Sequence, residues 1–511
     1  MSASLPILSL MIFLPWVGAL GLALAPGLSA RAARLLALTF SLSTLVLSGL
    51  ALCSFDPNIQ GYQFGETHDW IASLSVHFRL GLDGLSLVLV LLTGVIAPLS
   101  LLASWREPRE PRLLSLLFLL LQGAALGVFL AQDFVPWFLF WELSLVPAYF
   151  LIRLWGGPGA TRAAYQFVIY TIGGSAFMLL GFAALFLATG TLDLSALASL
   201  AAQGSLNPKL QALGGIWPTA VFLGVLLGLA VKVPLFPFHT WLPAAYAEAP
   251  TGASMFLTGV MSKMGVYGFL RILWPLFPAT LHAFAPGLLW LALGGVVFGG
   301  FAAMRQVDLK RMVAYSSVNH LSYCLLALFA VSAVARPGAD AATAALTGTI
   351  LQMFNHGISA AALFFCVGIL EVRSGGERGI GDFGGVRTAA PVFAGLCGIS
   401  MFSSLGLPGL NGFVGEFLIF RGTFGLVPWS AAVSCLGLFA TAYFLLTFWQ
   451  RVFHGPRAGA GARPFADLSG LEIATLAPLV AIMFAFGLFP QLLTVLFNPL
   501  VSSWVSHLAT P

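Results

Sequence analysis

The sequence predicts an all-helical protein that crosses a membrane many times. Hydrophobic residues make up 59% of the 511 residues and charged residues only 8%, whereas roughly a quarter of an ordinary soluble domain is charged. So few charged side chains cannot cover the surface of a soluble protein of this length. The apolar runs are continuous rather than alternating, which favours transmembrane helices over a β-barrel. The net charge of +5 is spread over loops, which excludes a nucleic-acid-binding protein.

We expect about fourteen membrane-spanning helices, each formed by a run of about 20 apolar residues. They are 6–24, 35–53, 84–103, 113–130, 134–151, 164–189, 219–236, 253–270, 288–303, 313–331, 344–369, 392–420, 426–449 and 475–497. No linker divides the chain, so we expect a single membrane domain over residues 1–511. The longest polar insertions, 54–79 and 192–216, are expected to form short caps at one end of the bundle.

The predicted loops differ in positive charge. Sixteen of the 23 lysines and arginines lie in loops that follow odd-numbered helices, and five lie in loops that follow even-numbered helices. Loops rich in lysine and arginine stay in the cytoplasm. We therefore expect both termini on the side opposite the cytoplasm, which is the periplasmic side if the protein lies in a bacterial inner membrane, the location that we expect.

Six ionisable residues fall well inside the predicted helices: Glu142, Lys232, Lys263, His320, His356 and Glu416. A charge at the bilayer centre costs at least about 2.5–3.5 kcal/mol on insertion scales, so these residues need partners or a water-filled route. Burial disfavours the charged forms of lysine and glutamate, which lets both exchange protons near neutral pH. The set predicts a proton relay. A structural scaffold, in which such charges only hold helices together, is the alternative.

Two predicted helices are interrupted beside these ionisable residues. Pro234 and Pro237 follow Lys232, and Pro408 precedes Glu416. A proline inside a helix removes a hydrogen bond and frees a carbonyl group. Two broken helices in corresponding halves of a membrane protein indicate a transporter built from inverted repeats.

The sequence carries no motif for a resident cofactor or metal. Its five cysteines form no CxxC pair, and we expect each to be a small buried apolar residue. The GxGxxG match at 379–384 follows a membrane helix rather than a strand, which indicates a loop and not a dinucleotide site. We therefore expect no cofactor and no metal in this chain.

Eight segments carry a likeness to a known family. They are GLDGLS (81–86), FLFWELSLVPAYFLI (138–152), VKVPLFPFHTWLP (231–243), EAP (248–250), SKMGVYGFLRI (262–272), DLKRMVAYSSVNHLSY (308–323), NHGISAAALFFCVG (355–368) and GLPGLNGFVGEF (406–417). In these segments and their order the chain resembles the antiporter-like membrane subunits of complex I, the proton-pumping NADH:quinone oxidoreductase. These subunits are similar to Mrp-type cation/proton antiporter subunits.

The resemblance implies a proton-translocating subunit with two inverted five-helix repeats. They would cover about 112–275 (helices 4–8) and 284–451 (helices 9–13), with discontinuous helices 7 and 12. The family's relay falls on Glu142, Lys232, Lys263, His320 and His356, and its exit residue on Glu416. A glutamate at this last position is typical of the M-type subunit, whereas the L- and N-types carry lysine.

The resemblance also implies partner subunits, and it leaves alternative functions open. L- and N-type subunits of the membrane arm and the lipid bilayer are the expected partners, and nucleic acid is not. NADH, FMN, iron–sulfur clusters and quinone are expected in partner subunits. The rivals are an Mrp-type cation/proton antiporter subunit and a membrane subunit of a ferredoxin- or hydrogenase-linked complex.

One segment departs from the family pattern. The family usually reads WLPDAH after the seventh helix, where this chain reads WLPAAY at 241–246. An acid and a histidine are therefore missing at the cytoplasmic mouth. The route by which protons arrive is left open, with Glu248 or a lipid-side route as possible substitutes.

Overall fold

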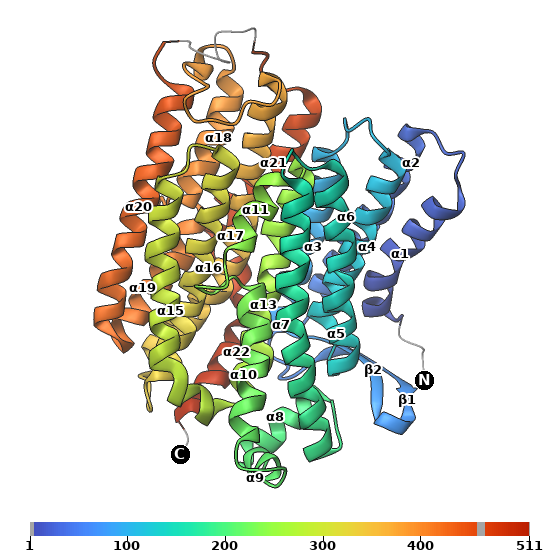
Figure 1. The fold of residues 1–511 in the computed structure, drawn as a ribbon, viewed down its shortest axis with the longest axis vertical. Helices are drawn as coiled ribbons and strands as arrows, with labels where there is room; N and C mark the ends of the chain where they lie inside the picture. Colours follow the sequence, from blue (N-terminus) through green and yellow to red (C-terminus); the bar gives the residue numbers. More distant parts are fainter. Residues whose placement is uncertain (1–4, 457–464, 510–511) are drawn as a thin grey trace.

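The computed structural model confirms a helical membrane protein (Figure 1). It describes residues 5–456 and 465–509. Within these ranges, eleven helices are long and apolar enough to cross a membrane, and two shorter apolar helices belong to broken ones. The predicted total of fourteen and the limits of the two repeats stay predictions. The first helix begins and the last helix ends at the same end of the bundle in Figure 1, so the number of passes is even.

The first half of the chain supplies the helices on one side of the bundle. They are α1 (Ile7–Leu24), α2 (Ala30–Ser54), α3 (Gly84–Ala103), α4 (Pro111–Leu130), α5 (Phe134–Leu143), α6 (Leu145–Trp155), α7 (Ala160–Thr189), α10 (Trp217–Lys232) and α11 (Trp241–Glu248). The next helix, over residues 251–276, joins α12 (Thr251–Phe256), α13 (Ser262–Gly268) and α14 (Trp274–Leu276) through two π-helical turns, η2 (Leu257–Met261) and η3 (Phe269–Leu273). We call it the bulged helix.

The second half completes the bundle. It contains α15 (Pro278–Met304), α16 (Leu309–Ala333), α17 (Ala339–Ser374), α18 (Pro391–Ser404), α19 (Asn411–Leu426), α20 (Pro428–Phe453), α21 (Gly470–Leu488) and α22 (Gln491–Ala509). An aspartate directly precedes each of the helices α3, α5 and α16: Asp83, Asp133 and Asp308. The carboxylate of each accepts a hydrogen bond from a backbone amide of the first turn, which satisfies a donor that has no partner within the helix.

The two polar insertions form the expected caps at the end that carries the termini (Figure 1). The first is an antiparallel hairpin of β1 (Gln63–Ile71) and β2 (Val76–Leu82). The second contains α8 (Leu194–Ala202) and α9 (Leu206–Gln211).

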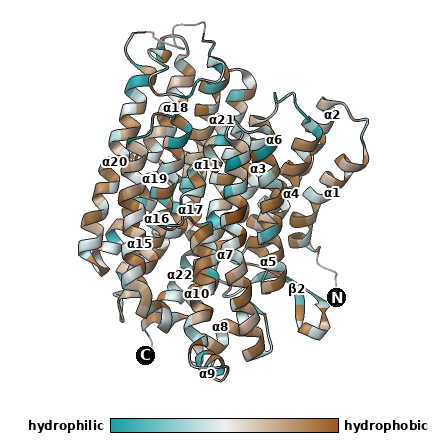
Figure 2. Cartoon of the chain, in the orientation of Figure 1, coloured by the Kyte–Doolittle hydropathy of each residue, from teal (hydrophilic) through white to brown (hydrophobic). Residues whose placement is uncertain are grey.

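The outside of the bundle is apolar, as a protein surrounded by lipid requires. Figure 2 shows hydrophobic colours along the helices, with hydrophilic colours at the loops and in short segments within the bundle. Large apolar side chains such as Leu187 and Ile169 are strongly exposed. The expectation that every cysteine is buried is wrong for Cys53 and Cys435, which lie on this apolar outer surface. Cysteine is itself apolar enough to be tolerated there.

Both predicted breaks are present. The first broken helix consists of α10, which ends at Lys232, and α11, which begins at Trp241. The second consists of α18, which ends at Ser404, and α19, which begins at Asn411. Gly406 lies in the second break at a φ of 78°, a left-handed conformation that favours glycine.

Asp467 fixes the start of α18 from a distant loop. Its carboxylate accepts hydrogen bonds of 2.9 Å from the backbone amides of Val392 and Phe393, and one of 2.8 Å from Leu468. Partial burial alone would raise the pKa of Asp467. The three amide donors, followed by the charge of Arg373, outweigh that effect and hold the pKa below its usual value.

Candidate functional site

Four of the predicted residues meet in a continuous row at the centre of the bundle. The Nζ atom of Lys263 lies 2.8 Å from Nδ1 of His356. The rings of His356 and His320 are stacked, with centroids 5.3 Å apart. Nε2 of His320 lies 3.3 Å from Oε1 of Glu416. The row therefore joins the bulged helix, α17, α16 and α19, and all four side chains are buried.

Lys263 is fully provided with hydrogen-bond acceptors. Its ammonium donates to the backbone carbonyl of Thr258, to Oγ of Ser262 at 3.2 Å and to Nδ1 of His356. These three acceptors use all three N–H groups of a charged lysine. Because Nδ1 of His356 accepts, the proton of a neutral His356 lies on Nε2. Lys263 stands between the two π-helical turns, irregularities that are frequent at functional sites.

His320 has the opposite pattern, since both ring nitrogens face acceptors. Nδ1 lies 2.7 Å from the carbonyl oxygen of Ser316. Nε2 lies 3.2 Å from the carbonyl oxygen of Ser404 and close to Glu416. A carbonyl oxygen only accepts, so this geometry fits an imidazolium with a proton on each nitrogen. Ser404 ends α18, where carbonyl groups lack partners within the helix and the helix dipole favours a cation.

The second helix break holds the carboxylate of Glu416. Nε2 of Gln352 lies 3.4 Å from Oε1 of Glu416, in position to donate. Gly406, in the break, lies against the other oxygen, and a Cβ atom there would be 2.7 Å from Oε2. The φ of Gly406 favours glycine, and a Cβ atom there would push the Glu416 carboxylate away from its present place. The break thus gives Glu416 a defined place beside His320.

Glu142 and Lys232, the two predicted residues in the first half of the chain, do not form a direct ion pair. Among the described residues, Nζ of Lys232 and Oε1 of Glu142 each lack a hydrogen-bond partner. The Lys232 ammonium instead lies over the ring of Trp141, 4.9 Å from its centroid, a cation–π contact. It also ends α10, where the helix dipole stabilises a cation. The ion pair between Glu142 and Lys232 that a structural scaffold would use here is therefore absent from this arrangement.

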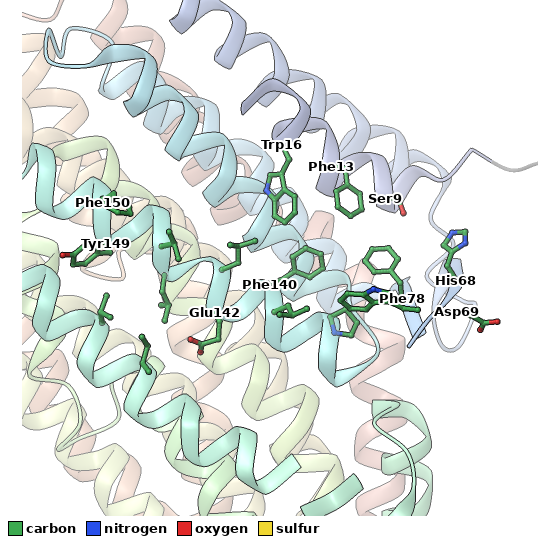
Figure 3. A pocket seen from close by; sticks show the side chains of 18 of the residues that line it. Ser9, Phe13, Trp16, His68, Asp69, Phe78, Phe140, Glu142, Tyr149 and Phe150 are labelled. Atoms are coloured by element: carbon green, nitrogen blue, oxygen red, sulfur yellow. The ribbon is translucent and has the colours of Figure 1, made fainter. Parts of the chain in front are cut away.

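Glu142 opens onto a large lateral groove. The groove has a volume of about 1110 Å³ and lies between α1, the hairpin, α5, α6 and α7. Figure 3 shows Phe13, Trp16, Phe78 and Phe140 gathered at one end, with Glu142 farther along the groove. Glu142 is therefore placed between the buried Lys232 and the side of the molecule, where an adjoining protein or lipid can act on it.

Two residues near the start of the bulged helix, Glu248 and Tyr246, have well-defined partners. Glu248, a suggested substitute for the missing acid, accepts a 2.9 Å hydrogen bond from the backbone amide of Gly159 and lies 3.8 Å from Arg378. It is thus engaged by fixed partners. Tyr246 is fully buried, and its hydroxyl donates to the carbonyl of Leu257 at 2.9 Å. The sequence reasoning also missed Gln352, Ser404 and Thr258. Their only signal was a polar residue within an apolar run.

The described residues contain no cluster of three or more histidine, cysteine, aspartate or glutamate side chains that could hold a metal ion. The GxGxxG segment is a loop after α17, as expected. Its first amide, of Gly379, donates to the carboxylate of Asp382 at 2.7 Å. This turn closes on itself rather than forming a cradle for phosphate.

Comparison with known proteins gives a consistent set of relatives. The family model described as "NADH:quinone oxidoreductase/Mrp antiporter, TM" matches residues 131–442. NADH-quinone oxidoreductase subunit M of Rhodobacter capsulatus is 36% identical over 508 residues, which cover 98% of this chain and 96% of that protein. F(420)H(2) dehydrogenase subunit M of Methanosarcina mazei is 35% identical over 463 residues, 88% of each chain. A chain of respiratory complex I from Thermus thermophilus with bound NADH has a TM-score of 0.84 and 29% identity, over 98% of this chain and 100% of that one.

Proposed function

Because the chain belongs to the family of NADH:quinone oxidoreductase and Mrp antiporter membrane subunits, we propose that it is the M-type, proton-translocating subunit in the membrane arm of a respiratory complex I. The complex is an oxidoreductase and translocase, and this chain contributes the translocation. The observation that supports this most is the unbroken row from Lys263 through His356 and His320 to Glu416.

The row has the donors and acceptors that a proton relay needs. A protonated Lys263 donates to Nδ1 of His356, and His320 donates from Nε2 to Glu416. Transfer between the two stacked rings requires a bridging water or the rotation of one ring, since their nitrogens do not face each other along a hydrogen bond. Release from Glu416 leads toward the end of the bundle that carries the termini, which we place in the periplasm.

In this proposal, electron transfer in partner subunits changes the electrostatic interaction between Glu142 and Lys232. Moving one charge against 100 mV requires about 2.3 kcal/mol. Two opposite unit charges at 4 Å attract by about 4 kcal/mol at an effective dielectric constant of about 20. Bringing Glu142 into contact with Lys232, or removing it, therefore changes the energy of the ammonium by enough to drive one translocation.

The partners follow from this assignment. L- and N-type subunits and lipid contact the sides of the bundle, and the groove beside Glu142 is a suitable place for such a neighbour. NADH, FMN, iron–sulfur clusters and quinone belong to partner subunits, so this chain performs no redox step. A second candidate is a membrane subunit of a related complex that uses a different electron donor. It is supported by F(420)H(2) dehydrogenase subunit M, which is almost as similar to this chain as the subunit from Rhodobacter capsulatus.

The test replaces Lys263 by glutamine in the complete complex. Glutamine keeps a hydrogen-bond donor beside His356 but cannot carry a proton. We expect NADH-driven proton uptake by membrane vesicles to be largely lost while the amount of assembled complex is unchanged. Normal uptake in this variant would refute the relay. The subunits that copurify decide between complex I and a complex with another electron donor.

A further inference from the structure

We propose that a stripe of hydroxyl groups on the bulged helix, partly exposed at its first member and buried at the rest, carries protons from the cytoplasmic end of the bundle to Lys263. The inference rests on the proposed function and supplies the arrival route that the sequence left open. The stripe consists of Thr251, Ser254, Thr258 and Ser262. Their spacing of three or four residues places them on one face of a helix, and that face leads from the start of α12 to Lys263.

The inner end of the stripe touches the relay. Oγ of Ser262 lies 3.2 Å from Nζ of Lys263. One turn earlier, Oγ1 of Thr258 lies 3.1 Å from Oγ of Ser317 on α16. Ser254, Thr258, Ser262 and Ser317 are all buried. Polar groups at this depth that face the bundle interior mark ion and proton pathways in membrane proteins.

The hydroxyl groups are free to accept a proton. Ser262 donates to the carbonyl of Thr258 at 2.8 Å, and Ser317 donates to the carbonyl of Val313 at 3.3 Å. A hydroxyl that donates once keeps two lone pairs. Each can therefore accept a proton on a lone pair and release its own once its O–H turns from the carbonyl toward the next group, and a water molecule would bridge gaps that exceed a hydrogen bond. Tyr246, whose hydroxyl bonds to the carbonyl of Leu257 in the same turn, adds a fifth hydroxyl beside the stripe.

The outer end of the stripe begins at a charged pair. Nζ of Lys310 lies 2.6 Å from Oε2 of Glu371 and donates to the carbonyl of Ala249 at 3.3 Å. The same carbonyl accepts from Ser254 at 3.2 Å. The side chain of Glu371 is 24% exposed, whereas that of Lys310 is 4% exposed. A partly exposed carboxylate and a buried ammonium thus lie beside the first buried hydroxyl of the stripe, and transfer from Lys310 to Ser254 needs a water between them because both donate to the same carbonyl.

The decisive variant is Thr258→Val, which replaces one hydroxyl by a methyl group of similar size. General acid–base groups contribute about 100- to 10,000-fold to proton-transfer rates, so we expect at least a tenfold loss of NADH-driven proton uptake per assembled complex. Thr258→Ser keeps the hydroxyl and should restore uptake. Thr93→Val is the matched control. Thr93 is a buried threonine of the neighbouring helix α3, and its hydroxyl bonds to the carbonyl of Leu89 in the same helix at 2.8 Å.

A second pair of variants guards against a folding defect at Thr258. Tyr246→Phe and Tyr267→Phe each remove one buried hydroxyl that donates to a backbone carbonyl. Only Tyr246 lies beside the stripe, so only Tyr246→Phe should slow uptake. Equal effects of the two tyrosine variants, or normal uptake in Thr258→Val, would overturn the stripe. If Lys263→Gln is inactive in the same vesicles, the proposed function survives that result, whereas an active Lys263→Gln refutes the proposed function itself.

Discussion

Replacing Glu416 by glutamine removes the acceptor at the end of the relay while changing the shape of the side chain very little. The carboxylate lies 3.3 Å from Nε2 of His320 and is contacted by Nε2 of Gln352. Glutamine fills the same space beside Gly406 and keeps a carbonyl oxygen that can accept from Gln352. It cannot take up or release a proton.

The energetic effect of Glu416→Gln follows from the distance between the Glu416 carboxylate and the His320 ring. Two unit charges 3.3 Å apart attract by about 5 kcal/mol at an effective dielectric constant of about 20. Without Glu416, a charged His320 would be a buried cation without its counterion, a loss of about 3–5 kcal/mol. His320 avoids this loss by giving up its proton. The substitution therefore removes two steps of the relay, the charge on His320 and the acceptor beyond it.

The assay is NADH-driven proton uptake by membrane vesicles, with the amount of assembled complex and the rate of NADH oxidation measured in the same preparation. We expect uptake in Glu416→Gln to fall at least tenfold while assembly stays normal. Glu416→Asp, which can titrate but is one methylene shorter, should retain part of the activity. Wild-type uptake in Glu416→Gln would show that the His320–Glu416 contact only packs helices, and the reasoning from the row would fail.

Three further predictions test other parts of the molecule. Lys232→Met and Glu142→Gln should each abolish pumping without lowering the stability of the complex. The structure gives the Lys232 ammonium no hydrogen bond to lose, whereas a scaffold role predicts a lower melting temperature. A reporter fused after Arg311 should lie in the cytoplasm and one fused after residue 511 in the periplasm, and the opposite result would invert the orientation. Asp467→Asn should lower stability by roughly 1 kcal/mol at neutral pH. Because folding lowers the pKa of Asp467, its contribution is complete above the ordinary value of about 3.9 and disappears as the pH falls through the lowered one. The melting temperatures of Asp467→Asn and the wild type should therefore converge below about pH 4, and a constant difference would argue against the carboxylate.

The sequence predicted the parts of the site that depend on local pattern. An ionisable residue inside an apolar run is visible without a structure, because its insertion is costly, and so is a helix break at Pro234 or Pro408. Long apolar runs predicted the eleven helices of the described ranges that are long enough to cross a membrane, and polar runs between them predicted the two caps and the loop at 379–384. The burial of Cys53 and Cys435 was predicted wrongly, because hydropathy does not distinguish a lipid-facing surface from a protein interior.

The order of contacts could not be read from the sequence. Lys263 and His356 are 93 residues apart, and the distance between them depends on how the bulged helix packs against α17. The same holds for His320 and the carbonyl of Ser404. The absence of a Glu142–Lys232 contact was likewise inaccessible, because a Glu and a Lys on neighbouring helices suit a contact and a gap equally well.

The two buried lysines differ in their hydrogen bonds, and in the proposed relay this difference would set the order in which they respond to a change at Glu142. Lys263 has an acceptor for each of its three N–H groups, so its charge is stable and its proton moves only when an acceptor changes. Lys232 has no hydrogen bond within the described structure and rests on an aromatic ring. Bringing the Glu142 carboxylate to about 4 Å from the Lys232 ammonium would stabilise the charged form of Lys232 by about 4 kcal/mol at an effective dielectric constant of about 20. In the proposed relay, energy supplied at the side of the bundle would therefore act first on Lys232, which has no hydrogen bond within the described structure, and the hydrogen-bonded row from Lys263 to Glu416 would carry the proton.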